Sequence, residues 1–502
     1  MKIVVIGAAP VGIGVAYRLN DLQKSGEASA NIKLTVLEKE ARPGGLSSSV
    51  VDEKGFTWDF GGHITFSDKD SAYYDKAMES SYKDWNKIAR NCQVDISYMY
   101  EEEGIRLVPY PAQFAIPFFP KQIKEACTKD LRQRYDVIQQ MYNELQKNDI
   151  IPEDFEQWVY KHLGPTIRDV FFKPYSRKVW TVELEKMNPD WVGTRVAMLP
   201  REKFEELCSM GPEELTGADF GWGPNKEFTY PKYGGTGAVW KSVTDTLPQS
   251  WFHYNAEVKV YLMIIIPIEI SEQTVTGVDA VKKQLVYKQT DGTCLSVKKI
   301  DYDVLISSAP IEQLVRFTRL CPEPKLLRNK VFIVGVGMTL PKPKFVEPFT
   351  WLYFPDPNVP FYRVSFLSRY GEVTPDNTKY WSLLCECAKK IEDPITEEEI
   401  REQTINGLVT KSIINREQIV SVYSTLLPYG YPIPSVERDN ELYRAHLVLE
   451  RHNIFSRGRF GGWKYECSNQ DHCFIQGKEI VDRIIFDKPE KLYQIGLPLR
   501  SG

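Results

Sequence analysis

Short apolar runs at the start of the chain predict a strand, a helix and a second strand. Lys2–Ile6 and Leu34–Glu38 are largely apolar, and between them Val15, Leu19 and Leu22 recur at helical spacing. This order is typical of a strand–helix–strand unit in a parallel sheet, whose strands are buried on both faces.

Helical spacing dominates from about residue 71 to residue 212. One helix in this segment is predicted to end at Gly164 and Pro165. A second is predicted to end at Pro174, because proline cannot donate the backbone hydrogen bond that continues a helix.

Aromatic and β-branched residues dominate after residue 228, which predicts a second region rich in strands. The clearest predicted strands are Val304–Ile306, Val331–Thr339 and Tyr380–Cys387. A helix follows Thr396, where Glu399 completes a capping box, and Phe474–Ile485 predicts a last helix. The N-terminal unit needs partners from these distant segments, so we expect discontinuous domains.

Size and charge narrow the class of protein. The 502 residues correspond to roughly three domains. Because 63 basic and 67 acidic residues give a net charge of −4, there is no electrostatic reason to bind nucleic acid or an anionic membrane. The longest apolar run in mid-chain, Leu262–Ile266, is far shorter than the roughly 20 residues of a membrane-spanning helix.

The nine cysteines form no disulfide framework, since their number is odd and their spacing irregular. Cys467, His472 and Cys473 lack the spacing of a metal site, so no metal is expected. The apolar N-terminus could be read as a signal peptide, but a glycine-rich turn interrupts it. These features favour a cytoplasmic protein with reduced thiols.

That turn, GAAPVG at Gly7–Gly12, follows the first strand and opens the first helix. Its glycines let the backbone approach a pyrophosphate, whose charge the helix N-terminus favours. Ala9 replaces the middle glycine, and Glu38 is placed to accept hydrogen bonds from a ribose. An ordinary tight turn is the alternative. The predicted dinucleotide-binding residues are Gly7, Pro10, Val11, Gly12 and Glu38.

Two further glycine pairs indicate a flavin rather than a nicotinamide. One precedes Leu46 and Ser47, and the other precedes His63. Paired glycines after the second strand resemble the FAD-binding pattern of amine oxidase-like flavoproteins, in which the backbone lies against the ribityl chain and the flavin ring. The pattern adds to the cofactor site Gly45, Leu46, Ser47, Gly61, Gly62 and His63.

Motifs along nearly the whole chain then make the resemblance specific. The chain resembles the eukaryotic-type UDP-galactopyranose mutases, which are FAD enzymes of that superfamily. The matching stretches are GGHITFS (61–67), VPYPAQ (108–113), KVW (178–180), TRVA (194–197), GWGPNKEF (221–228), YGGTG (233–237), WLYFP (351–355), PFYR (360–363), YGYPIP (429–434), SRGRFGGWKYE (456–466) and NQDH (469–472).

The resemblance implies a reaction without net redox change. Members interconvert the pyranose and furanose forms of UDP-galactose. Reduced FAD attacks the anomeric carbon through N5 and expels UDP, and the sugar recloses as the furanose before UDP returns. The protein's part is positioning and electrostatics.

The resemblance also implies roles for single residues. Arg195 and Arg363, which would grip the diphosphate, and His63, which would face the flavin, are the implied catalytic residues. The implied substrate-binding residues are Tyr110, Gln113, Ser176, Trp180, Asn225, Tyr353, Tyr370, Tyr431 and Tyr465. The implied late cofactor-binding residues are Val258, Arg459, Asn469, Gln470 and Asp471.

The chain departs from the family motifs at several positions. Asp68 replaces a histidine, Asp95 an arginine, and three positions of a third motif are changed, namely Lys173, Ser176 and Arg177. An acid near a flavin disfavours its anionic reduced form, so we expect these changes to affect redox tuning and contacts to the flavin ring rather than the diphosphate grip.

Together these observations predict an α/β flavoprotein with three parts. They are a discontinuous Rossmann-like FAD-binding domain (1–85, 228–310 and 440–502), a helical substrate domain (86–227) and an antiparallel β-sheet domain (311–439). The predicted function is UDP-galactopyranose mutase, with FAD as cofactor, NADPH or NADH as reductant and a UDP-sugar as partner. A mutase for another UDP-sugar, an amine oxidase-like oxidoreductase and a non-catalytic nucleotide-sugar binder are the alternatives. Oligomeric state stays open.

Overall fold

A five-stranded parallel sheet joins three distant parts of the chain. The computed structural model describes residues 1–65, 71–101, 104–143, 154–193, 195–211, 214–215, 226–258, 261–263, 273–275, 277–292 and 294–495. The strand order is β22 (Ile454–Ser456), β16 (Val304–Ser307), β1 (Lys2–Ile6), β2 (Lys33–Leu37) and β9 (Phe252–His253). A doubly covered parallel sheet of this kind confirms the predicted Rossmann-like fold.

Alternate side chains of this sheet enter two different cores. Ile3 and Val5 pack on one face, and Val4 and Ile6 on the other, because successive strand residues point to opposite faces. The first face is covered by α1 (Pro10–Lys24), α2 (Ala72–Ser81), α9 (Gly235–Asp245) and α13 (Gln470–Phe486). The second face is covered by α10 (Ile311–Thr318) and α12 (Arg438–Glu450).

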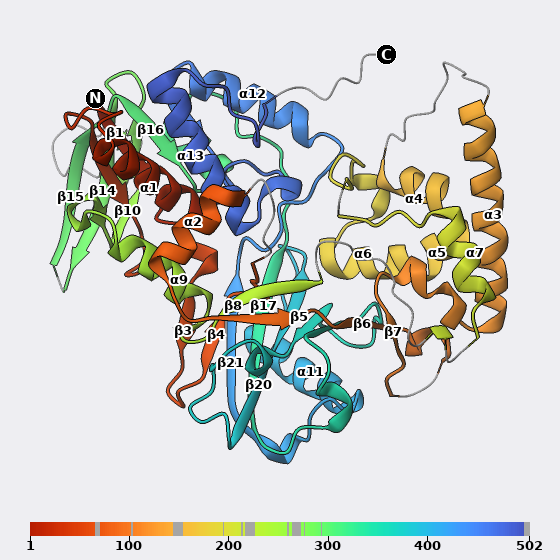
Figure 1. Ribbon diagram of the computed structural model, residues 1–502. Coiled ribbons are helices and arrows are strands. Elements are labelled where there is room, and N and C mark those ends of the chain that lie inside the picture. The colour runs from red at the N-terminus through yellow and green to blue at the C-terminus, as the bar shows by residue number, and fades with distance from the viewer. Residues whose placement is uncertain are drawn as a thin grey trace.

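A second, seven-stranded sheet lies below the first in Figure 1. Its order is β21 (Ile419–Leu427), β17 (Lys330–Thr339), β20 (Tyr380–Lys389), β19 (Arg363–Ser365), β18 (Trp351–Tyr353), β6 (Cys92–Asp95) and β7 (Leu107–Pro109). All neighbours are antiparallel except β18 and β6. Helix α11 (Glu397–Thr410), with the predicted capping box at Thr396, covers one face. Because β6 and β7 join this sheet, the predicted boundary at residue 86 assigns two of its strands to the helical segment.

The helical layer lies to the right in Figure 1. It consists of α3 (Lys121–Asn143), α4 (Phe155–Leu163), α5 (Pro165–Ile167), α6 (Lys173–Trp180) and α7 (Arg201–Ser209). None of the helices in the described ranges is both long and apolar enough to cross a bilayer.

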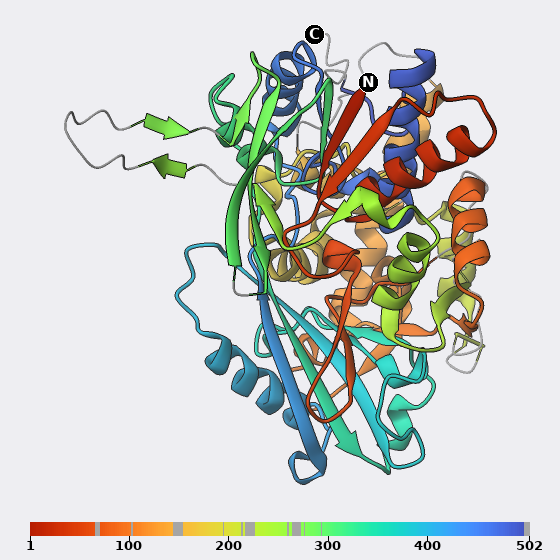
Figure 2. The same ribbon diagram turned by 90° about the vertical axis from the view of Figure 1, so that its left-hand side faces the viewer.

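The remaining strands form small sheets. They are β3 (Ser49–Val51) with β4 (Thr57–Asp59), β5 (Trp85–Ala89) with β8 (Glu227–Pro231), β11 (Tyr261–Met263) with β12 (Gln273–Val275), and β10 (Ala256–Val258), β13 (Val278–Asp279) and β15 (Cys294–Asp301) with β14 (Gln284–Asp291). Strands β11 and β12 stand away from the rest of the chain at the left of Figure 2.

A turn of π-helix keeps the chain helical past Pro174. The Lys173 N–H donates to the carbonyl of Arg168, five residues back. Pro174 has no N–H to offer the carbonyl of Val170, and the Tyr98 hydroxyl donates to that carbonyl instead, at 2.8 Å. The prediction that this helix ends at Pro174 is therefore wrong, because a distant hydroxyl replaces the missing donor.

Two glycines of β17 let the β3–β4 hairpin lie flat on the large sheet. A Cβ atom at Gly335 would lie 2.4 Å from the Trp58 ring, and one at Gly337 would lie 2.6 Å from the Phe56 ring. The two rings stack on each other with centroids 5.7 Å apart. This contact determines how closely the end of β4, and with it residues 60–63, approaches the large sheet.

We predict that Gly335→Ala destabilises the protein by about 1–3 kcal/mol, the usual cost of overpacking a filled core. The added methyl has to displace Trp58, which is fully buried. Urea unfolding measures the difference. Gly211→Ala is the control, because the nearest atom to its added Cβ lies 3.7 Å away. Equal midpoints for the two variants would contradict the packing argument.

Candidate functional site

The glycine turn after β1 leaves no room for side chains. Gly7 has φ +99°, and a Cβ atom there would lie 2.2 Å from Ser308 Oγ. A Cβ atom at Gly12 would lie 2.0 Å from the Gly7 carbonyl oxygen. Pro10 and Val11 begin α1 and are buried. The turn therefore has the bare backbone that close approach of a pyrophosphate requires.

Glu38 lies just after the end of β2, and its side chain contacts this turn. Its Oε2 accepts from the Ala8 N–H at 2.7 Å and its Oε1 from the Glu40 N–H at 2.9 Å. Burial raises the pKa of the Glu38 carboxyl, and these two bonds oppose the shift. Since a carboxylate offers about four acceptor positions, two bonds leave capacity for ribose hydroxyls.

The methyl group of Ala9 is accommodated by a second glycine. A Cβ atom at Gly45 would lie 3.0 Å from Ala9 Cβ, so the absence of a side chain at Gly45 makes space for Ala9. The Gly44 N–H donates to the Ala8 carbonyl at 2.8 Å, and Gly45–Ser47 form one 3-10 turn. The two predicted glycine motifs are therefore in direct contact.

The third glycine pair lies against the large sheet. A Cβ atom at Gly61 would lie 3.3 Å from Glu386 Oε1, and one at Gly62 would lie 3.0 Å from Arg363 Nη2. A side chain at either position would crowd the end of the Glu386 or Arg363 side chain, which would have to shift by a few tenths of an ångström. The structure thus brings the predicted flavin loop and the predicted diphosphate arginine together.

His63 follows this pair and is neutral at pH 7. Burial is the main cause that lowers its pKa to about 4, and the charges of Arg459 and Arg363 add to it while Glu386 opposes them. Its Nδ1 is buried and has no hydrogen-bond partner in the described part of the chain. A buried polar atom without a partner is a position at which a ligand group can bind.

Arg363 forms a buried ion pair with Glu386 across β19 and β20. Its Nε donates to Glu386 Oε2, and its Nη2 donates to Oε1 at 2.8 Å. Burial alone would lower the pKa of Arg363, but the Glu386 carboxylate raises it well above its ordinary value. The Tyr362 hydroxyl lies 3.3 Å from the Tyr431 hydroxyl and 3.4 Å from Glu386. Sequence reasoning missed Glu386, whose one signal is a single charge inside an apolar strand.

Arg195 reaches the same region from the helical layer. Its Nη2 donates to the Glu466 carbonyl at 2.9 Å and to Asn469 Oδ1 at 3.3 Å. Its guanidinium lies 5.3 Å from the centre of the Tyr465 ring. Arg195, Tyr465 and Asn469 were predicted for three different roles and here form one contact group.

Arg459 lies over the aromatic rings of this group. Its guanidinium is 5.0 Å from the Tyr431 ring and 5.8 Å from the Tyr465 ring, and its Nη1 donates to Ser468 Oγ at 3.3 Å. Trp180 packs edge-on against both tyrosines, at 5.4 and 4.9 Å. The guanidinium groups of Arg195, Arg363 and Arg459 and several aromatic rings therefore lie together beside the His63 loop.

Two of the predicted substrate-binding residues, Tyr110 and Gln113, lie on the segment after β7. The rings of Tyr110 and Tyr353 are 4.5 Å apart, and burial is the main cause that raises the pKa of Tyr353 to about 12. Gln113 is buried and its Nε2 donates to the Ala197 carbonyl. These tyrosine hydroxyls stay protonated at pH 7 and can donate hydrogen bonds.

Other predicted residues are less directly connected to this group. The Tyr370 hydroxyl donates to the Thr350 carbonyl at 2.8 Å, and only 1% of the residue is exposed. Ser176 is buried on α6, and Val258 is buried on β10 in the core beneath the parallel sheet. Asn225 lies outside the described residues.

The start of α13 ties the late cofactor segment to the N-terminal part. Gln470 Oε1 accepts from the Trp240 indole N–H at 3.1 Å, and its Nε2 donates to Thr65 Oγ1 at 3.2 Å. Asn469 is the N-cap residue and Asp471 lies in the first turn. Gln470 therefore links α13 to α9 and to the segment after His63.

The predicted effect of Asp95 on a flavin is not supported by its surroundings. Lys411 Nζ lies 2.9 Å from Asp95 Oδ2 and 2.7 Å from Asp356 Oδ2, and all three residues are buried. Although burial would lower the pKa of Lys411, hydrogen bonds to the two carboxylates raise it. The charge of Asp95 is thus compensated by a lysine rather than directed at a cofactor.

Two of the other departures are ion pairs at the protein surface. Lys173 Nζ lies 3.5 Å from Asp169, and Arg177 Nη2 lies 2.7 Å from Glu183 with both side chains more than half exposed. Asp68 lies outside the described residues.

Asn329, which sequence reasoning missed, connects two predicted substrate residues. Its Nδ2 donates to the Val179 carbonyl and its Oδ1 accepts from the Tyr431 N–H, both at 2.8 Å. Because Val179 precedes Trp180, one fully buried amide holds Trp180 and Tyr431 in a defined relation. Nothing in its sequence context, RNK, distinguishes Asn329 from a turn residue.

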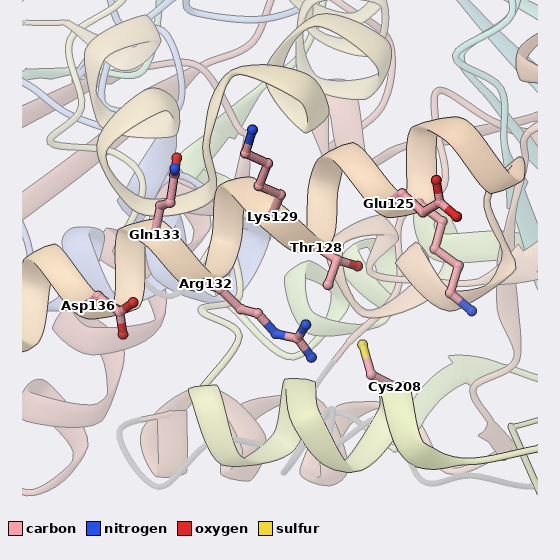
Figure 3. Close-up of a pocket in the computed structure, with 8 residues that line it drawn as sticks. Glu125, Thr128, Lys129, Arg132, Gln133, Asp136 and Cys208 are labelled. Atoms are coloured by element: carbon pink, nitrogen blue, oxygen red, sulfur yellow. The ribbon is translucent and has the colours of Figure 1, made fainter.

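A hollow between α3 and α7 is separate from this group (Figure 3). It is lined by Lys124, Glu125, Thr128, Lys129, Arg132, Gln133, Asp136 and Cys208, none of which was predicted for the site. Arg132 Nη2 lies 2.7 Å from Glu205 Oε2. Within the described ranges, His, Cys, Asp and Glu side chains form no group of three that could hold a metal ion.

Comparisons with known proteins agree with this architecture. The family described as NAD(P)-binding Rossmann-like domain matches residues 5–77. A crystal structure of reduced UDP-galactopyranose mutase is similar with a TM-score of 0.80 and 31% identity, covering 97% of this chain and 94% of that one. A putative protoporphyrinogen oxidase from Exiguobacterium sp. 255-15 (TM-score 0.63, 14% identity, 97% and 99% covered) and a putrescine oxidase (0.54, 13%, 97% and 99%) share the fold alone.

A Rossmann-like nucleotide-binding unit joined to a large mixed sheet and a helical layer defines a protein of the amine oxidase-like flavoprotein superfamily. The glycine motifs, Glu38 and the His63 Nδ1, which has no partner among the described residues, are consistent with that class. Within it, the chain belongs to the UDP-galactopyranose mutase family.

We predict that His63 makes stability pH-dependent in the apoprotein. Its pKa is about 4 when folded and about 6.5 when unfolded, so its contribution is complete above pH 6.5 and is lost as the pH falls toward 4. When the pH falls from 7 to 5, the free energy of unfolding of the wild type should decrease by about 2 kcal/mol more than that of His63→Gln. Urea unfolding at the two pH values measures this. The buried His446 is present in both proteins, so its contribution to the pH dependence cancels in the comparison. Equal decreases in the free energy of unfolding of the two proteins would contradict a buried, neutral His63.

Proposed function

We propose that this protein interconverts UDP-galactopyranose and UDP-galactofuranose with bound, reduced FAD. The observation that carries the proposal is the charge balance beside the His63 loop. Arg363 is neutralised by Glu386, whereas Arg195 and Arg459 donate to neutral oxygens in the part of the chain that the structure describes. Their two positive charges match the roughly two negative charges of a UDP-sugar diphosphate.

Each group of residues has a distinct task in this proposal. The guanidinium groups bind the diphosphate when it leaves the sugar and keep it near when it returns. Tyrosine hydroxyls that burial keeps protonated, such as Tyr353 and Tyr431, donate hydrogen bonds to its oxygens. Trp180 fills the space between Tyr431 and Tyr465 and excludes water.

The cofactor assignment follows from the N-terminal motifs. The turn at Gly7–Gly12 would hold the pyrophosphate, Glu38 the ribose, and Gly61–His63 the flavin ring. When bound and reduced, FAD supplies the nucleophilic N5 for the anomeric carbon. NADPH or NADH is the proposed reductant, and it is needed only to reduce the flavin at the start, because each cycle would return the flavin in its reduced form.

We expect the purified protein to show the absorbance bands of oxidised flavin and to be inactive in that form. In oxidised flavin N5 is electron-poor, so conversion of UDP-galactofuranose should begin only after addition of dithionite, NADPH or NADH. A catalytic amount of reductant should suffice, because the reaction has no net redox change. Chromatography of the sugar nucleotides measures conversion, with the unreduced protein under air as control.

The same assay separates the alternatives. Conversion by the fully oxidised protein under air would contradict the proposal. Oxygen consumption with an amine substrate would indicate an oxidoreductase, and a flavin-free protein would indicate a nucleotide-sugar binder. Conversion of a different UDP-sugar in place of UDP-galactose would keep the chemistry and change the substrate.

We predict that Arg195→Ala lowers kcat/KM by about thirty-fold to several thousand-fold. Losing one partner of a buried charge contact costs roughly 2–5 kcal/mol, at about 1.4 kcal/mol per tenfold. Arg177→Ala is the matched control, because Arg177 is more than half exposed and pairs with Glu183. Flavin occupancy, measured by absorbance, should be unchanged in both.

A different variant is needed at Arg363. Arg363→Ala alone would leave Glu386 buried and unpaired, which lowers stability as well as activity. The double variant Arg363→Ala/Glu386→Gln removes that charge. It should fold and still have greatly reduced kcat/KM. Near-wild-type activity in this variant, or in Arg195→Ala, would overturn the diphosphate assignment.

A further inference from the structure

Lys178 holds together two elements of the proposed substrate site. It lies on α6, two residues before Trp180, and its stem is partly buried. Its Nζ donates to the carbonyl oxygens of Asp356 and Phe361, each at 2.7 Å. Neither the mechanism above nor the implied family roles make use of this ammonium group.

The two carbonyls belong to opposite limbs of one loop. The loop leaves β18 after Tyr353 and enters β19 at Arg363, and the Phe354 N–H donates to the Tyr362 carbonyl across it at 3.0 Å. One nitrogen therefore connects both limbs to α6. The distance between Tyr353 and Arg363, and their distance from Trp180, depend on this contact.

Four ionisable groups face Lys178 from the surrounding elements. They are Cys387 from β20, Asp356 from the loop, Asp95 from β6 and Lys411 after α11. Burial is the main cause that lowers the pKa of Lys178 to about 7. Because Lys411 already binds both carboxylates, they do little to offset that burial for Lys178.

We propose that Lys178 is a positioning residue whose protonated ammonium braces the Tyr353–Arg363 loop against α6, so that binding of a UDP-sugar is linked to protonation of this side chain. The inference rests on the proposed function for the identity of the ligand. It concerns a residue that does not itself contact the reacting atoms.

The direction of the linkage follows from charge. A diphosphate bound by the guanidinium groups of the site adds about two negative charges close to the braced loop, which favours the ammonium form of Lys178. By reciprocity, protonation of Lys178 favours the diphosphate. Above pH 7 the neutral amine keeps two N–H donors but loses the charge assistance that makes such bonds about twice as strong.

The test is the affinity of the oxidised holoenzyme for UDP-galactose, measured by calorimetry from pH 6 to pH 8.5. Binding avoids any titration that belongs to the chemical step, and the two phosphates of UDP-galactose hold one charge each throughout this range. We expect affinity to fall about three- to tenfold as the pH rises, the effect of weakening two charge-assisted bonds. Near pH 7, calorimetry in buffers of different ionisation enthalpy should show proton uptake on binding.

At pH 6, Lys178→Met should bind UDP-galactose more weakly than the wild type does. Its affinity should not depend on pH, and its binding should show no proton uptake. Lys330→Met is the matched control, since Lys330 also donates to a backbone carbonyl, that of Asp393, and lies 5.8 Å from a phenylalanine ring. It should behave like the wild type in both respects.

The outcomes separate the two proposals. If the wild type binds UDP-galactose with the same affinity from pH 6 to pH 8.5, or if Lys178→Met keeps the proton uptake, the role of Lys178 is wrong and the proposed function stands. If the wild type does not bind UDP-galactose at any pH, the proposed function is wrong and the inference falls with it. The wild-type profile decides the matter even if Lys178→Met fails to fold.

Discussion

The ion pair between Arg363 and Glu386 is the interaction on which the geometry of the site depends. It joins β19 to β20 at one register position, and Gly61 and Gly62 lie so close to it that a Cβ atom would stand 3.3 Å from Glu386 Oε1 or 3.0 Å from Arg363 Nη2. A buried pair of this kind costs desolvation energy and contributes little net stability. Its effect is to hold an arginine in place while cancelling its charge. The positive field for an anionic ligand then comes from Arg195 and Arg459, which belong to other parts of the chain.

Local features of the sequence predicted much of the fold. The βαβ unit, the capping box at Thr396 and the apolar strands of both sheets follow from periodicity and from neighbouring residues. Contacts between distant segments could not be predicted in this way. Strands β6 and β7 join a sheet whose other members lie more than 200 residues away, and no pattern within 92–109 signals that pairing. The glycine motifs and arginines of the site were recognised from motifs, whereas Glu386 and Asn329 lie in no motif, although the residues they contact do.

The departures from the family motifs also could not be interpreted without knowing the contacts between distant segments. Ala9 introduces a methyl group that is accommodated by Gly45, 36 residues later, and Asp95 introduces a charge that Lys411, 316 residues later, compensates. A single position can be read as unfavourable when its compensating partner is distant in sequence. Because cores are close-packed and buried charges need partners, the cost of each such change depends on the residue it faces. Substitutions near a site therefore have to be judged with the residue each one faces.

An irregular turn before helix α6 affects the positions of residues in the candidate site. The π turn before Pro174 shifts the helix by one residue relative to a regular α-helix, and the Tyr98 hydroxyl donates to the Val170 carbonyl, to which Pro174 cannot donate. With that shift, Lys178 points to the β18–β19 loop and the Val179 carbonyl meets Asn329. In a regular helix the side chains after the turn would be rotated by about 100°. The two contacts that hold Trp180 beside Tyr431 and the Arg363 loop would then be lost together, so the irregular turn is part of what assembles the site.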